Sequence, residues 1–183
     1  YMPGRFSLYQ DLSVEENLDF FATIFQTSKE ENFHLIRDIY VQLEPFRDRR
    51  AGKLSGGMKQ KLALCCALIH RPKVLFLDEP TTGVDAVSRR EFWAMLKNLQ
   101  KHEITILVST PYMDEANLCD KISLIQEGRI MASNSPRQII ERFPKSIYGV
   151  YTRDKYLTLH VLQDLAITDK IYPFGESLHW ILK

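Results

Sequence analysis

Two adjacent carboxylates, Asp78 and Glu79, are the residues of this chain best suited to carry out chemistry. They follow a short, wholly apolar run at residues 74–77, which predicts a strand buried on both faces of a parallel sheet. At the carboxyl end of such a strand, Asp78 could hold a magnesium ion through water while Glu79 polarises an attacking water. The alternative is an acidic turn before Pro80.

A helix that begins with Ser55, Gly56 and Gly57 is a second candidate site. Its apolar residues recur at helical spacing, namely Met58, Leu62, Cys65, Cys66 and Ile69. Because free backbone amides and the positive end of the helix dipole lie at a helix N-terminus, this segment attracts a phosphate. The alternative is a glycine-rich turn in which Ser55 is an ordinary cap.

The remaining sequence predicts the elements that position these residues. Ser13 and Glu16 form a capping box at the start of one helix. Further helices are expected at residues 30–43, 87–101, 113–118 and 136–143. A buried strand is expected at 104–108. A hairpin is expected at 122–125 and 129–132, at the edge of the sheet. The tail adds a strand near 147–151, a helix near 156–165 and a hairpin around Gly175. This alternation is typical of an α/β layered fold.

Composition excludes several classes of function. The chain has 183 residues with 24 Lys plus Arg against 23 Asp plus Glu, so a general electrostatic grip on nucleic acid is not expected. The longest apolar run, residues 62–69, is far short of the ~20 residues of a membrane helix, so we expect a soluble chain. Three cysteines without metal-type spacing indicate small core residues in a reducing compartment.

Taken together, the segments at 54–60 and 73–79 resemble the ATP-binding cassette (ABC) family, and Thr81-Thr82-Gly83-Val84-Asp85 continues the match. The resemblance covers residue 1 to about residue 143. It implies a P-loop NTPase-like α/β core that binds ATP and Mg²⁺. The roles that it implies are the signature for Ser55, Gly56 and Gly57, the Walker B metal-binding aspartate for Asp78, the catalytic carboxylate for Glu79, and the D-loop aspartate for Asp85.

The resemblance also implies a domain organisation. We expect an ABC ATPase domain at residues 1–143 that lacks its N-terminal part, with a helical subdomain at about 12–69. Residues 144–183 form a small α+β accessory region. Met58, Lys59 and Gln60 after the glycines, together with this tail, are similar to the ATPase subunits of ABC-2-type exporters, including multidrug-type ones.

The sequence departs from the family pattern at three places. No G-x-x-x-x-G-K-[ST] loop occurs, and because the chain starts at Tyr1 without an initiator methionine, we expect a fragment that is inactive alone. Gly4 stands where the Q-loop, resembled by residues 1–9, has a glutamine. Pro111 stands where the switch region, resembled by residues 107–115, has a histidine, and proline has no backbone donor. The last two departures suggest a slow or degenerate ATPase.

Three functions are therefore open. The first is an ATP-hydrolysing exporter subunit that pairs with a second ABC ATPase domain and a transmembrane permease, peripheral on the cytoplasmic face of the inner or plasma membrane. The second is a degenerate cassette that supplies its signature in trans without hydrolysis. The third, a soluble ABC protein of translation or DNA repair, is disfavoured because the chain shows neither a charged linker nor a coiled-coil insertion.

Overall fold

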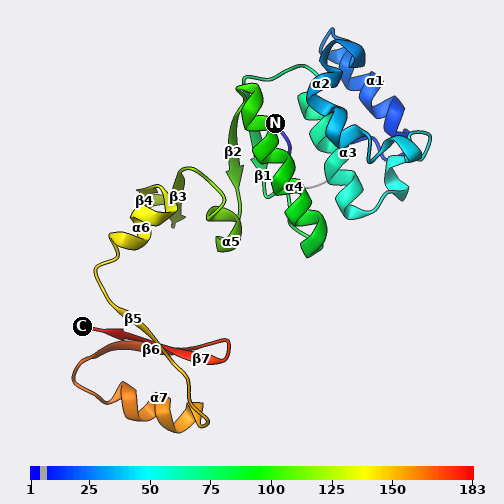
Figure 1. The fold of residues 1–183 in the computed structure, drawn as a ribbon. Helices are drawn as coiled ribbons and strands as arrows, with labels where there is room; N and C mark the ends of the chain where they lie inside the picture. The colour runs from blue at the N-terminus through cyan, green and yellow to red at the C-terminus, as the bar shows by residue number, and fades with distance from the viewer. Residues whose placement is uncertain (5–7) are drawn as a thin grey trace. The chain divides into compact units, whose positions relative to one another are not determined.

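The computed structural model describes residues 1–4 and 8–183, which divide into two compact units, Tyr1–Leu118 and Cys119–Lys183 (Figure 1). Each unit is described by itself. The division lies after Leu118, whereas the sequence placed the end of the ABC domain after residue 143. Contacts within a chain need not follow a family's domain boundary, so the boundary at 143 remains a prediction.

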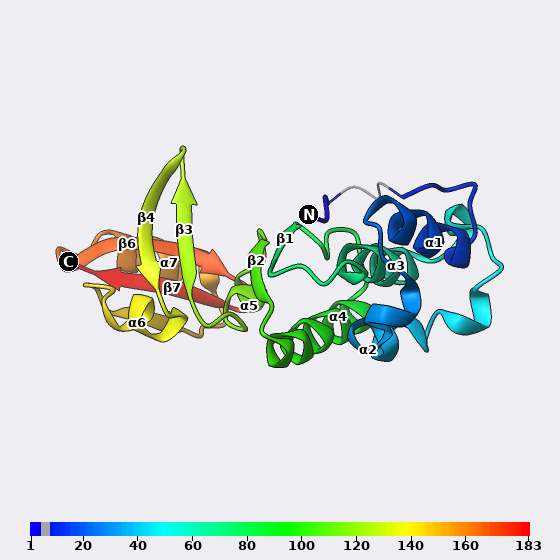
Figure 2. The same cartoon turned by 90° about the horizontal axis from the view of Figure 1, so that it is seen from above.

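Three helices form the N-terminal half of the first unit, namely α1 (Val14–Ile24), α2 (Lys29–Tyr40) and α3 (Gly56–Leu68) (Figure 2). Two 3-10 turns, η1 (Glu44–Phe46) and η2 (Ala51–Lys53), lie between α2 and α3. The capping box predicted at Ser13 and Glu16 is confirmed at the start of α1. Apolar side chains fill the core between the helices, including Leu18, Ile36, Leu43, Leu62, Leu64 and Leu68.

The other half of this unit is a parallel strand pair with its connecting helix. Strands β1 (Val74–Asp78) and β2 (Thr105–Ser109) pair in parallel, so that Asp78 lies opposite Ser109. Helix α4 (Ala86–Leu99) and the 3-10 turn η3 (Gln100–His102) connect them, and α5 (Met113–Ala116) follows β2. Met2 forms a parallel bridge with Leu77, on β1.

The prediction that β1 is buried on both faces was wrong for the described structure, and so was the prediction that β2 is a buried strand. In β1, Leu75 and Leu77 are buried, whereas Val74 and Phe76 are 44% and 46% exposed. In β2, Leu107 is 60% exposed. Successive side chains of a strand point to opposite faces, and among the described residues only one face of this small sheet is covered by a core.

The second unit contains a hairpin and a small α+β fold. Strands β3 (Ile122–Gln126) and β4 (Arg129–Asn134) pair antiparallel and are followed by α6 (Pro136–Glu141), capped by Ser135. The hairpin was expected at the edge of the β1–β2 sheet, but it forms a two-stranded sheet of its own. The backbones of β3 and β4 hydrogen-bond to each other, and in the described structure neither strand hydrogen-bonds to β2.

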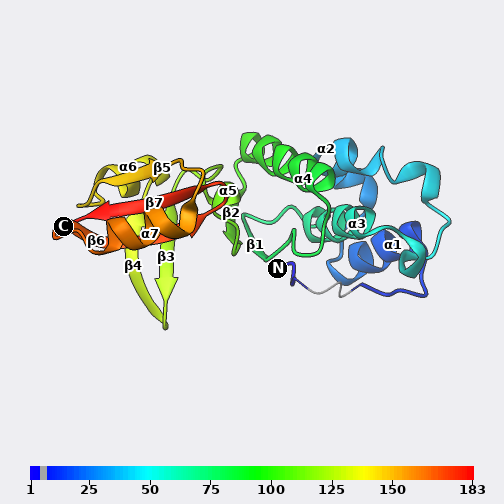
Figure 3. The same cartoon turned by 90° about the horizontal axis from the view of Figure 1, so that it is seen from below.

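The tail folds as predicted into strands around one helix. Strands β5 (Ile147–Val150), β6 (Thr168–Phe174) and β7 (Ser177–Leu182) form an antiparallel sheet in the order β5-β7-β6. Helix α7 (Lys155–Gln163) connects β5 to β6 and packs against β6 and β7 (Figure 3). Gly175, with a φ of 54°, occupies the turn between β6 and β7, where glycine adopts a left-handed conformation without strain.

Within residues 1–4 and 8–183, none of the helices has the length and apolar character that crossing a membrane requires.

Candidate functional site

Asp78 lies at the carboxyl end of β1 with an exposed carboxylate. Its Oδ1 atom accepts a hydrogen bond of 2.6 Å from the hydroxyl of Ser109, the residue opposite it on β2. Its Oδ2 atom accepts one of 3.3 Å from the hydroxyl of Tyr1. The parallel register therefore fixes the orientation of the carboxylate, as expected for side chains at the carboxyl edge of a parallel sheet.

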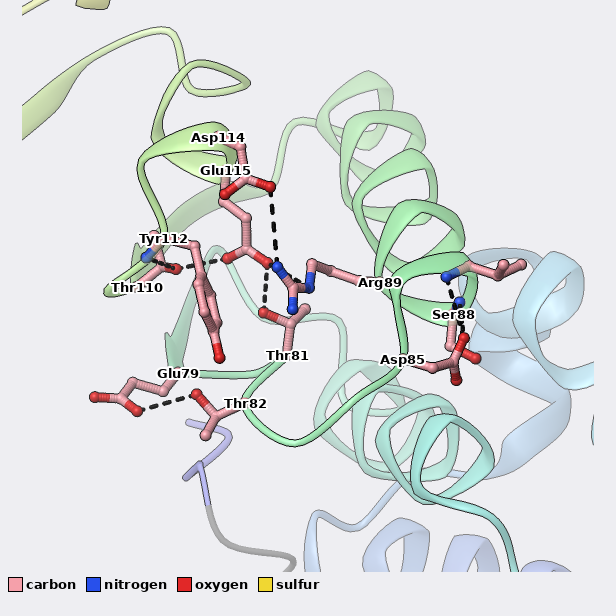
Figure 4. A network of polar contacts seen from close by, with 11 residues as sticks. Glu79, Thr81, Thr82, Asp85, Ser88, Arg89, Thr110, Tyr112, Asp114 and Glu115 are labelled. Atoms are coloured by element: carbon pink, nitrogen blue, oxygen red, sulfur yellow. Dashed lines mark hydrogen bonds and ion pairs between the residues drawn. The ribbon is translucent and has the colours of Figure 1, made fainter. Parts of the chain in front are cut away.

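Glu79 follows directly and has an unusual backbone conformation. Its φ of 45° lies in the left-handed region, which is strained for a residue with a side chain. Its amide donates to both the carbonyl and the hydroxyl oxygen of Ser109, each at 3.0 Å. Its Oε2 atom accepts a hydrogen bond of 3.1 Å from the hydroxyl of Thr82 (Figure 4). Both the backbone and the carboxylate of Glu79 are thus held by neighbours.

The donor set at this edge suits a magnesium ion that brings its own remaining ligands. Among the described residues, no group of three or more His, Cys, Asp or Glu side chains could enclose a metal. Magnesium is commonly bound through one or two carboxylates, with waters and substrate phosphates completing the octahedron. Asp78, which is exposed and already oriented by Ser109, fits that mode of binding.

Ser55, Gly56 and Gly57 lie at the N-terminus of α3, as predicted. Ser55 is the N-cap, and its hydroxyl accepts from the amide of Met58 at 3.3 Å. Ser55 and Gly56 are exposed, whereas Gly57 is buried. Because the first amides of a helix have no partner within the helix, the exposed part of this turn can donate to an anion.

Gly57 lies against the first turn of α4. A Cβ atom at Gly57 would be 2.7 Å from Oγ and 2.9 Å from Cβ of Ser88, closer than real Cβ contacts. A Cβ atom at Gly56 would lie 3.8 Å from the carbonyl oxygen of Gly83, an ordinary contact. Gly57 therefore allows α3 and α4 to approach closely, a packing role that the sequence did not reveal.

Asp85 is the N-cap of α4. Its Oδ1 atom accepts from the amides of Val87 at 3.1 Å and Ser88 at 3.0 Å. Hydrogen bonds from the amide and the side chain of Ser88, followed by the amide of Val87, hold the pKa of the Asp85 carboxyl below its ordinary value. In this chain Asp85 starts a helix, and its role as a link across a dimer remains a prediction.

A buried network that the sequence did not predict lies beside Glu79. The carboxylate of Glu115, on α5, is 1% exposed and accepts from the hydroxyls of Thr81 and Thr110, each at 2.6 Å (Figure 4). Nε of Arg89, on α4, lies 3.6 Å from Oε1 of Glu115. Apart from their positions next to the two strand ends, nothing in the sequence marks these residues as neighbours.

Comparison with known proteins shows which proteins the chain resembles. The family model described as "ABC transporter" matches residues 1–82. The probable multidrug ABC transporter ATP-binding protein YbhF of Escherichia coli K12 is 44% identical over 100% of this chain, which covers 32% of that protein. The Nod factor export ATP-binding protein I of Burkholderia lata is 41% identical over 76% of this chain and 47% of its own length. Over its whole length the chain is thus similar to part of an ABC transporter ATP-binding protein.

A solved structure also resembles this chain. The dimeric ATP-binding cassette MJ0796, in a post-hydrolysis state bound to ADP and Pi, superposes with a TM-score of 0.60 and 25% identity, covering 71% of this chain and 59% of that one. The mixed α/β fold of this chain is thus that of an ABC cassette. The chain spans about a third of the length of YbhF and about half that of the Nod factor export protein.

Two of the three departures from the ABC pattern, Gly4 and Pro111, have different surroundings. A Cβ atom at Gly4 would lie 2.7 Å from the carbonyl oxygen of Asp78, because Met2 is bonded to β1 on both sides of Leu77. A glutamine at position 4 would therefore require the backbone to shift. Residues 5–7 of the expected Q-loop segment lie outside the described residues. Pro111 is exposed, between Thr110 and Tyr112 of the network.

Proposed function

We propose that this chain is part of an ATP-binding and ATP-hydrolysing subunit that powers an ABC exporter. The observation that carries the proposal is the pair Asp78 and Glu79 at the carboxyl end of β1, with both residues bonded to Ser109 of β2. Two adjacent carboxylates repel each other unless a cation offsets their charge. Phosphoryl transfer to water requires a cation and a water between such carboxylates and the phosphates.

Each residue has a proposed part in the reaction. Asp78 holds Mg²⁺ through water, and Ser109 keeps its carboxylate in the required orientation. Glu79 orients the attacking water and polarises it, with its carboxylate held by Thr82. When bound, Mg²⁺ neutralises charge on the phosphate oxygens. Positioning and electrostatics account for most catalysis of this kind, so the fixed geometry of the two carboxylates is central to the proposal.

Ser55, Gly56 and Gly57 are proposed to bind the phosphates of ATP held by a second ABC domain. The exposed amides at the start of α3 supply the donors. Asp85 is proposed to lie at the interface between the two domains. The dimeric state of MJ0796 and its bound ADP and Pi support this arrangement by similarity.

The proposed partner in the membrane is a transmembrane permease, which the helical region α1–α3 would contact as the dimer closes. The subunit would then be peripheral, on the cytoplasmic face of the inner or plasma membrane. Support comes from the names of its relatives, one a multidrug transporter protein and the other a Nod factor export protein. The exported substrate is selected by the permease and is not part of the proposal.

The test is ATPase activity of the complete protein, including any sequence that flanks this chain, with Glu79 replaced by Gln. Glutamine keeps the size of the side chain and the bond from Thr82 but is a far weaker base. We expect turnover to fall on the order of 10²-fold or more while ATP still binds. Turnover that is unchanged in E79Q would contradict hydrolysis at this site.

Pro111 favours a second candidate, a degenerate cassette that supplies its signature in trans and hydrolyses ATP slowly or not at all. Proline offers no donor to a γ phosphate, either from its side chain or from its backbone. If this candidate is correct, P111H in the complete protein raises turnover. Wild-type turnover at an ordinary rate for an ATPase, about 1–10³ s⁻¹, would exclude it.

A further inference from the structure

Glu115 has a side-chain carboxylate that is almost completely buried. A carboxylate that is 1% exposed gives up its hydration, a cost that must be offset by hydrogen bonds and a nearby cation. Here the hydroxyls of Thr81 and Thr110 each donate to a different oxygen of Glu115, and Arg89 lies beside Oε1. A buried charge with this many dedicated partners indicates a structural requirement at this point of the fold.

The partners of Glu115 come from the two segments that hold Glu79. Thr81 lies in the connection from β1 to α4, next to Thr82, which donates to the Glu79 carboxylate. Thr110 directly follows Ser109, which accepts from the Glu79 amide through two oxygens. Glu115 therefore ties together the segment that holds the side chain of Glu79 and the segment that holds its backbone (Figure 4).

The other contacts of the network fix the segment around Pro111. The Thr110 hydroxyl, while it donates to Glu115, accepts from the amide of Tyr112 at 3.1 Å. The guanidinium carbon of Arg89 lies 4.2 Å from the centre of the Tyr112 ring, a cation–π contact. Loss of the Glu115 carboxylate would thus release both Thr110 and the turn that follows it.

Glu79 needs such support because its left-handed backbone is strained. A non-glycine residue with a φ of 45° keeps that conformation only when its surroundings enforce it. Its amide bonds to Ser109 and its side-chain bond to Thr82 are the contacts that do so. The amide bonds depend on the relative placement of the two segments that Glu115 joins. The bond from Thr82 lies within the segment that Thr81 fastens to Glu115, so it depends on the conformation of that segment.

We propose that Glu115 is a positioning residue for Glu79. It holds the segment after β1 and the segment after β2 in place, so that the Glu79 carboxylate stays directed at the water that attacks ATP. The proposal rests on the proposed function of Glu79. Glu115 itself is buried and touches neither substrate nor water in the reaction.

The experiment measures kcat and KM for ATP in the complete protein with E115A, and with E115A and E79Q combined. E115A should lower kcat on the order of 10-fold to 10²-fold, because a small displacement of a catalytic group has effects of that size, and should leave KM within about 2-fold. In the E79Q background, E115A should cause no further loss under single-turnover conditions, since the group that it positions is already gone.

A milder pair of variants covers the case in which E115A fails to fold. T110V removes the hydroxyl while keeping the shape of the side chain, and T110S keeps the hydroxyl. T110V should lower kcat in the same direction, and T110S should restore most of it. D114A is the matched control, because Asp114 is the exposed neighbour of Glu115 on α5 and lies 3.9 Å from Arg89; its kcat should equal that of the wild type.

The outcomes separate this inference from the proposed function. Normal kcat in both E115A and T110V overturns the role of Glu115, as does an equal fractional loss with and without E79Q. A rise in KM at constant kcat also overturns it, because it would indicate a binding role. If E79Q alone leaves the rate unchanged, the proposed function of the site is overturned instead. The positioning role of Glu115 then falls with it.

Discussion

At the scale of single residues, Asn17 is the most heavily bonded side chain of α1. It is fully buried, its Oδ1 atom accepts from the amide of Tyr9 at 3.1 Å, and its Nδ2 atom donates to three carbonyl oxygens. These belong to Tyr9, Leu12 and Ser13. The amide side chain therefore fastens the segment that leads into α1 to the helix itself.

Replacing Asn17 with Asp should destabilise the chain by about 2–3 kcal/mol at pH 7, because an oxygen would then face three carbonyl oxygens in a buried site. The measurement is the free energy of unfolding in urea by circular dichroism. Asn117→Asp serves as the control, since Asn117 is exposed and such substitutions change stability by less than about 0.5 kcal/mol. Equal stability of the two variants would contradict the role given to Asn17.

His70 makes the stability of the first unit sensitive to pH. Its ring stacks on Phe25 with a centroid distance of 4.0 Å, and burial lowers its pKa below the ordinary value of 6.5. The unfolded chain therefore binds a proton near pH 6.5, while the folded chain binds it only at lower pH. Stability is present in full above pH 6.5 and is lost as the pH falls through the folded pKa.

We expect His70→Phe to make the melting temperature fall less steeply between pH 7.5 and pH 5.5 than in the wild type. Phenylalanine keeps the stacking on Phe25 and has no proton to bind. His102→Gln, at an exposed position, should leave the slope as it is in the wild type. A His70→Phe slope as steep as that of the wild type would show that another group causes the acid sensitivity.

At the scale of the elements, the contact between Gly57 and Ser88 joins the start of α3 to the start of α4. Gly57→Ala should destabilise by about 1–3 kcal/mol through overpacking, and Ser88→Gly in the same chain should recover most of the loss by removing both close atoms. Gly56→Ala is the matched control, with only an ordinary contact to Gly83 and the better helix propensity of alanine. Chemical denaturation measures the free energy of unfolding of the three variants. If Gly57→Ala combined with Ser88→Gly is no more stable than Gly57→Ala alone, this contact is ruled out as the cause.

The helices could be predicted from the sequence because their signals are local. The capping box of Ser13 with Glu16 and the cap of Ser55 lie within three residues of the amides that they bind. The periodicity of α3 is likewise contained in one stretch of chain. The burial of the strands was not predictable in this way, since the exposure of Val74 and Phe76 depends on which elements cover each face of the sheet.

The candidate site shows the same division. Asp78, Glu79 and the start of α3 were predicted from short motifs, and the structure places them at the ends of the expected elements. Glu115 could not be found, because its bond to Thr81 joins residues 34 positions apart. Only the folded chain brings the end of β1 and the beginning of α5 together.

At the scale of the whole molecule, the chain carries one tryptophan in each compact unit. Trp93 lies on α4 and is 5% exposed, and Trp180 lies on β7, where its Nε1 atom donates to Thr168 at 2.8 Å. Each compact unit with its own set of contacts can unfold separately. The two indole rings can therefore report on the two units independently.

We expect the fluorescence of Trp180→Phe and of Trp93→Phe to give unfolding transitions in urea with different midpoints. In each variant the remaining tryptophan lies in the unit without a substitution, so each curve describes an unaltered unit. Coincident midpoints and slopes would mean that the chain unfolds as one cooperative body. Circular dichroism of the wild type, which sees both units, should then show a single transition as well.

The left-handed backbone at Glu79 has a consequence for evolution as well as for chemistry. A non-glycine side chain in this conformation costs about 1–3 kcal/mol, and glycine would remove that cost. Glu79→Gly should therefore raise the melting temperature of the chain while it abolishes the carboxylate. Selection for folding alone would favour glycine at this position, so under the proposed catalytic role of Glu79 the glutamate exchanges thermodynamic stability for activity.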